Sequence, residues 1–87
     1  MTLDELKGVF GTNQTYCSKI STADLANIMK FVNVSLQMDK DTFDYYYEID
    51  IHELIASSIS DGILDRMKKQ GWSFNSDGDS LILYLEN

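Results

Sequence analysis

Proline is absent from this sequence of 87 residues, cysteine occurs once, and 7 basic residues stand against 14 acidic ones. The lone Cys17 excludes an intramolecular disulfide. It also favours a reducing cytoplasm, because the first ten residues do not form a secretion signal. No apolar run approaches the roughly 18–20 residues of a membrane-spanning helix. At 44% hydrophobic residues the chain is too apolar to be disordered. We therefore expect one soluble, cytoplasmic domain over residues 1–87.

Residues for catalysis and for metal binding are equally scarce. A cysteine nucleophile needs a nearby base, and the only histidine, His52, is expected on the outer side of a helix, away from Cys17. A zinc site would need more cysteine and histidine than the chain contains. The acidic turns at residues 39–43 and 75–80 lack the spacing of a calcium loop. We expect no enzyme, no metal site and no cofactor.

Cap signals followed by apolar residues at helical spacing predict four short helices. The first contains Gly8 and needs tertiary packing to persist, and the last is expected to close at Gly71. Residues 12–20, between the first two helices, are expected to form a loop. The predicted N-caps are Thr2, Ser21, Asp50 and either Ser60 or Asp61.

After the second predicted helix the apolar period changes from 3.6 to 2, which predicts a β-hairpin. A single register would gather its large apolar side chains on one face, toward the core. The opposite face would carry Asp44, Tyr46 and Glu48. The predicted cross-strand pairs are Met38 with Phe43, Leu36 with Tyr45, and Val34 with Tyr47.

A second hairpin is predicted at the end of the sequence. The dipeptide Asp77-Gly78 is preferred in two-residue type I′ turns, which need positive φ at both positions. The outer face of this hairpin would carry Ile82 and Tyr84, two apolar residues that could be buried in a homo-oligomer. The predicted cross-strand pairs are Phe74 with Leu81 and Trp72 with Leu83.

The predicted element order is therefore ααββααββ, an α+β fold. Its two antiparallel β-hairpins pack against the short helices, and the most economical assembly joins them in one four-stranded sheet. From Ile51 to Leu85 the order helix, turn, helix, hairpin resembles a winged helix-turn-helix, whose second helix enters the major groove of DNA. This resemblance rests on element order, and it implies a nucleic-acid contact at Arg66, Lys68 and Lys69.

The charge distribution argues against nucleic acid as a partner, and without a membrane-spanning run we expect no membrane contact either. Between residues 39 and 65 many carboxylates stand against one lysine, Lys40, and the formal net charge is −7. Such a field repels phosphate and favours a basic protein surface, although it would also simply keep a small domain soluble. Asp61 at the start of the second winged-helix-like helix adds to the repulsion.

We therefore predict a small interaction or inhibitor protein that engages a basic surface of a protein partner. In size and charge the chain is similar to small accessory proteins of bacteriophages and mobile elements, including those that act as DNA mimics. A winged-helix DNA-binding regulator and a structural subunit that forms a homo-oligomer are the alternatives. The predicted partner-binding residues are Asp39, Asp41, Asp44, Tyr46, Glu48, Asp50 and Glu53.

Overall fold

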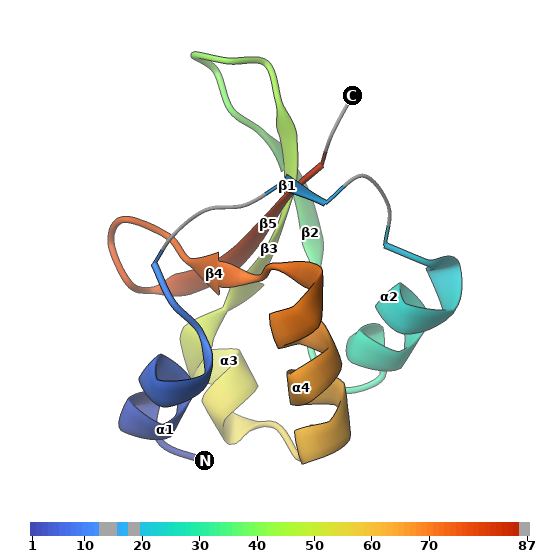
Figure 1. Cartoon of the computed structure of the whole chain (residues 1–87), viewed down its shortest axis with the longest axis vertical. Coiled ribbons are helices and arrows are strands. Elements are labelled where there is room, and N and C mark those ends of the chain that lie inside the picture. Colours follow the sequence, from blue (N-terminus) through green and yellow to red (C-terminus); the bar gives the residue numbers. More distant parts are fainter. Residues whose placement is uncertain (13–15, 18–19, 86–87) are drawn as a thin grey trace.

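A computed structural model describes residues 1–12, 16–17 and 20–85 of the chain (Figure 1). Within these residues four helices pack against a mixed β-sheet, which confirms the predicted α+β fold. None of these described helices is both long and apolar enough to cross a membrane. The helices are α1 (Leu3–Val9), α2 (Thr22–Met29), α3 (Ile51–Ala56) and α4 (Asp61–Gln70). The strands are β1 (Tyr16–Cys17), β2 (Ser35–Met38), β3 (Tyr45–Asp50), β4 (Ser73–Phe74) and β5 (Ser80–Leu85).

All four helices begin where the local sequence predicts. In each, the side chain of the N-cap residue accepts a hydrogen bond from the backbone N–H three residues later, which satisfies one of the unpaired N–H groups of the first turn. Gly71 closes α4 with a φ of 99°, a left-handed conformation that glycine adopts without a steric penalty. The N-caps are Thr2, Ser21, Asp50 and Ser60.

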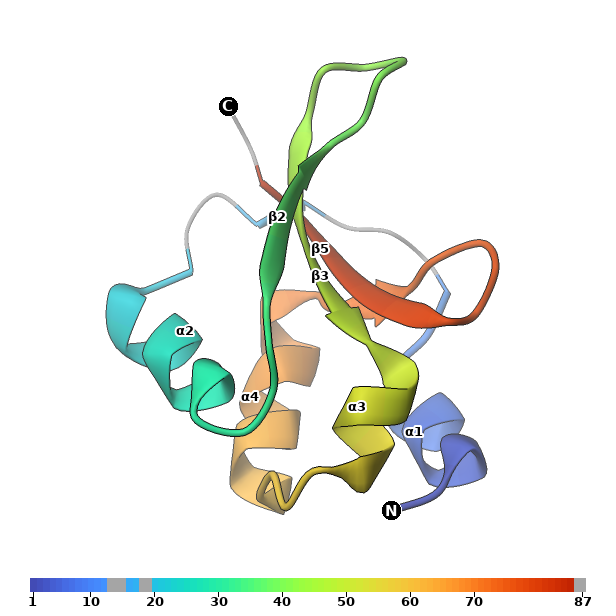
Figure 2. The ribbon, with the colours of Figure 1, turned by 180° about the vertical axis from the view of Figure 1, so that it is seen from behind.

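The central strand of the sheet is β5. It pairs antiparallel with β3 on one side, and on the other side it pairs antiparallel with β4 and parallel with β1. The edge strand β2 pairs with β3 (Figure 2). The two predicted hairpins therefore join in one four-stranded antiparallel arrangement through β3 and β5, to which β1 is added.

The prediction of a loop over residues 12–20 is wrong at β1. Tyr16 lies opposite Tyr84 and Cys17 opposite Leu85, so this short strand extends the sheet along the end of β5. Two residues are too few to produce a detectable alternation of apolar and polar side chains. What defines β1 is its pairing with a strand almost seventy residues away. Residues 13–15 and 18–19 of the predicted loop lie outside the described residues.

The register predicted for the β2–β3 hairpin is wrong by two residues. Met38 pairs with Tyr45 in place of Phe43, and Leu36 pairs with Tyr47. The turn is longer than expected, because the Asp39 N–H donates to the Asp44 carbonyl (2.8 Å) and closes a six-residue loop. A shift of two residues leaves every side chain on its predicted face.

In the second hairpin Phe74 pairs with Leu81 as predicted, but the type I′ turn is wrong. Positive φ occurs at Gly78 (74°) and not at Asp77. The Gly78 N–H donates to the Asn75 carbonyl (3.1 Å), and the Asn75 side chain accepts from the backbone N–H of Asp79 (3.1 Å). The Asn75 amide thus organises a longer turn that the Asp-Gly pair alone did not indicate.

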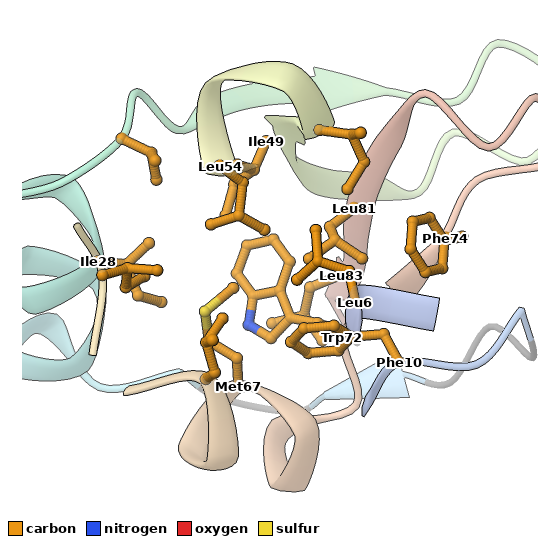
Figure 3. Packing of buried hydrophobic residues seen from close by; sticks show 14 residues of the cluster. Leu6, Phe10, Ile28, Ile49, Leu54, Met67, Trp72, Phe74, Leu81 and Leu83 are labelled. Carbon is orange, nitrogen blue, oxygen red and sulfur yellow. The ribbon is translucent and has the colours of Figure 1, made fainter. Parts of the chain in front are cut away.

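The core lies between the helices and the inner face of β3 and β5, and all four helices contribute to it (Figure 3). Trp72 occupies the middle of this cluster, is 3% exposed, and donates its indole N–H to the Gln70 side chain (3.0 Å). The indole is therefore both packed and hydrogen-bonded, as a buried tryptophan requires. Its labelled neighbours in Figure 3 include Leu6, Phe10, Leu54, Met67, Leu81 and Leu83.

Candidate interaction surface

The far end of the β2–β3 hairpin projects beyond the layer of helices (Figures 1 and 2). Its large apolar side chains are between 45% and 68% exposed. The prediction that this apolar face is buried is therefore wrong here, because none of the described helices reaches the end of the hairpin to cover it (Figures 1 and 2). We call these four residues the hairpin patch: Leu36, Met38, Phe43 and Tyr45.

Phe43 is the most exposed residue of the hairpin patch, and its backbone is strained. Its φ of 61° makes it the one non-glycine residue in the described ranges with positive φ. This conformation is unfavourable for a bulky side chain, and such strain often occurs at functional sites. The Phe43 N–H donates to the Asp39 carbonyl (2.8 Å), so a hydrogen bond of the turn helps to hold this backbone conformation.

Asp39 is the residue that organises this turn. Its carboxylate accepts hydrogen bonds from the backbone N–H of Asp41 (2.9 Å) and from the hydroxyl of Tyr84 in β5 (3.2 Å). The bond from the Asp41 N–H, with help from Tyr84 and Thr42 and against a smaller effect of burial, holds the pKa of Asp39 below its ordinary 3.8. Asp39 therefore has a structural role besides its charge, whereas Asp41 is exposed beside it.

Asp39→Asn is expected to loosen the hairpin turn at neutral pH. Because folding lowers the pKa of Asp39, its ionised form favours the folded state above the ordinary value, and this contribution disappears as the pH falls through the folded-state pKa. Amide hydrogen exchange of the turn should be measured from pH 7 to below about pH 4. We expect the variant to exchange faster than the wild type only at the upper end of this pH range. An equal effect of Asp41→Asn would contradict the assignment.

The outer face of β3 carries three of the predicted residues in a row, namely Tyr46, Glu48 and Asp50. Of these, Asp50 is also the N-cap of α3, and its carboxylate accepts from the Glu53 N–H (3.0 Å). Glu53 in turn accepts from the Asn33 N–H (2.8 Å). Glu48, Asp50 and Glu53 line one cleft, so the structure brings these three carboxylates together while giving two of them structural hydrogen bonds.

The basic residues of the winged-helix interpretation lie on α4. Arg66 forms an ion pair with Asp24 of α2 (2.6 Å), and Lys69 pairs with Asp65 one turn earlier (3.1 Å). The first of these pairs joins α4 to α2. Two of the three predicted phosphate-binding side chains are therefore already matched by carboxylates, which weakens their attraction for phosphate. Lys68 is exposed on the same helix.

The two residues proposed for a homo-oligomer contribute little accessible apolar surface. Ile82 is 3% exposed, although it does not belong to the core cluster, and Tyr84 is half-buried. On the face opposite the core, Ile82 lies beside Glu48 and Ser73 of the neighbouring strands. Most of the apolar area that an oligomer would cover there is thus already removed from water.

Comparison with known proteins finds no matching family model, and no curated protein or solved structure with significant similarity. Among the described residues, no group of histidine, cysteine and carboxylate side chains has an arrangement that could hold a metal ion. The fold and the site thus define a small acidic α+β protein whose distinguishing feature is a projecting hairpin with an apolar, carboxylate-flanked end.

Proposed function

We propose that this protein binds a basic surface of a protein partner through the projecting end of the β2–β3 hairpin. The observation that supports this proposal is the hairpin patch, in which four large apolar side chains stay exposed on a chain that otherwise buries most of its large apolar residues. Apolar side chains gathered on one exposed segment and edged by polar groups are typical of interaction sites. The proposal includes a cytoplasmic setting, in keeping with the single cysteine.

Charge decides which occupant fits the patch. Asp39, Asp41 and Asp44 lie in the turn next to it, with Lys40 as the one base among them. A second copy of the chain would bring two acidic turns together, and each copy has a net charge of −7. This contact between like charges is unfavourable. A partner with an apolar centre and a basic rim complements both features, because apolar burial supplies affinity while charge supplies rate and selectivity.

An inhibitory role follows if the covered surface is one that holds nucleic acid. An acidic hairpin seated there would exclude phosphate groups by direct competition for the same lysine and arginine side chains. The protein would then act as a mimic of DNA toward its partner, in a bacteriophage or mobile-element setting.

A photo-crosslinking phenylalanine analogue at position 43 tests the surface. We expect it to capture a partner from lysate that the same analogue at Ala56, an exposed residue of α3, does not capture. The captured protein is then identified and purified for kinetic measurements. Equal capture from both positions, or a patch that only joins two copies of this chain, would rule out the proposed surface.

With the purified partner, Asp41→Lys is expected to lower the association rate by about tenfold at 50 mM salt, with most of the difference gone at 500 mM. The matched control is Asp65→Lys on α4, which makes the same change in net charge and should alter the rate by less than about twofold. An effect of Asp41→Lys that ignores salt would contradict the electrostatic part of the proposal. Tight binding of duplex DNA by the protein alone would instead support the winged-helix alternative.

A further inference from the structure

A pocket of about 290 Å³ opens on the outer face of the sheet, opposite the core. Side chains alternate along β3 and β5, so Tyr46 and Glu48 share this face with Tyr84 and Ile82. The strand register places Tyr46 directly opposite Tyr84, and Glu48 directly opposite Ile82. The turn between β4 and β5 supplies the remaining wall, at residues 75–77. The pocket is therefore built from β3 and from the β4–β5 hairpin, which are far apart in the sequence.

Two tyrosine rings form one side of this pocket. The ring centroids of Tyr46 and Tyr84 are 5.1 Å apart, with the rings tilted by 42°. The hydroxyl of Tyr84 donates to Asp39, which fixes the orientation of that ring. Ile82, which is 3% exposed, also lines the pocket and keeps water away from its floor. A rigid aromatic surface is thus present where a flat group could stack.

The same pocket is electrostatically negative. Glu48 and Asp77 line it, and the described residues around it include no basic side chain. Burial raises the pKa of Tyr46 above its ordinary 10.0, and the charges of Glu48 and Asp39 raise it further. Burial is the larger cause of this rise and would disfavour any charge, so the attraction for a cation comes from the carboxylates of Glu48 and Asp77 that line the pocket.

We propose that this pocket receives an arginine side chain of the basic partner, with the guanidinium group stacked on the tyrosine rings and hydrogen-bonded to the carboxylate of Glu48. Aromatic faces attract cations, and a planar guanidinium stacks on them while presenting paired N–H donors that match a carboxylate. A lysine ammonium group would satisfy the charge but not the stacking. This inference rests on the proposed function and adds a second contact. Because the pocket lies on the face of the hairpin opposite Leu36, Met38 and Tyr45, the partner must reach both faces.

The probe is the peptide acetyl-Gly-Arg-Gly-amide, titrated into the isotopically labelled protein and followed by amide chemical shifts. We expect saturable shifts that concentrate at Tyr46, Glu48, Ile82 and Tyr84. The matched peptide in which neutral citrulline replaces arginine should bind at least about tenfold more weakly, because it keeps the shape and loses the charge. A lysine peptide should fall between the two.

Glu48→Gln is expected to weaken binding of the arginine peptide by about fivefold or more. Asp65→Asn, which removes one charge on α4, should change the affinity for the peptide by less than about twofold. Equal binding of the citrulline peptide, shifts confined to the acidic turn at residues 39–44, or no shifts at all would overturn the pocket. If the peptide does not bind the pocket but the crosslinking at position 43 and the salt effect of Asp41→Lys are observed, only the arginine site is ruled out. If the peptide binds the pocket but the crosslinking and the salt effect are both absent, the proposed hairpin surface is ruled out.

Discussion

Trp72→Ala is expected to lower the free energy of unfolding by about 3–5 kcal/mol, a large fraction of the total for a chain of this length. The indole is 3% exposed and touches the cluster to which all four helices contribute, so its removal leaves a cavity that no single element can collapse to fill. It also removes the indole N–H that donates a hydrogen bond to the Gln70 side chain (3.0 Å). The variant should therefore unfold at a much lower urea concentration than the wild type.

Urea denaturation followed by far-ultraviolet circular dichroism measures this loss, since the variant has no tryptophan fluorescence to follow. Trp72→Phe is the matched control, because it keeps an aromatic ring in the cluster and loses only part of the contact. Its expected loss is about 1–2 kcal/mol. A cost below about 1 kcal/mol for Trp72→Ala would mean that the helices do not close on the sheet as described.

Phe43→Asn is expected to weaken partner binding by tenfold or more while the free energy of unfolding stays the same or rises by up to about 1 kcal/mol. Stability is kept or gained because the φ of 61° is unfavourable for phenylalanine and tolerated by asparagine. Binding is lost because the phenyl ring, which is 68% exposed, is the group that a partner would cover. Surface residues kept for folding alone do not behave in this way.

Binding is measured with the partner identified by crosslinking, and stability by urea denaturation of the same preparation. Leu3→Ser is the matched control, because it also removes a partly exposed apolar side chain. Leu3 is in α1, which lies at the opposite end of the molecule from the projecting end of the β2–β3 hairpin (Figure 1). We expect Leu3→Ser to leave the affinity within about twofold. If Phe43→Asn lowers stability and leaves binding intact, Phe43 supports the fold and not an interface.

The candidate site could be predicted only in part. Charge and strand alternation correctly place Tyr46 and Glu48 on the outer face of β3, because alternation is a property of the strand itself. Alternation does not reveal which face is covered, and Tyr45 was therefore expected to be buried although it is 48% exposed. Likewise the composition counts Asp39 and Glu53 as charges without showing that both hold backbone N–H groups in place.

The sequence by itself determined the features that depend on neighbouring residues. Each N-cap, from Thr2 to Ser60, bonds an N–H three residues away, so its chemistry is complete within one turn. The pairing of Phe74 with Leu81 is similarly local, because a short turn brings the two strands together. These interactions involve little loop closure, and the local pattern is enough to specify them.

Only the tertiary structure decided the features that depend on distant segments. The pairing of β3 with β5, which joins the hairpins and creates the outer-face pocket, links residues at least thirty positions apart. The existence of β1 and the exposure of the hairpin patch also depend on where other elements end. The physical reason is that burial belongs to a pair of surfaces: a strand carries its apolar face in its own sequence, but whether anything covers that face depends on the rest of the chain.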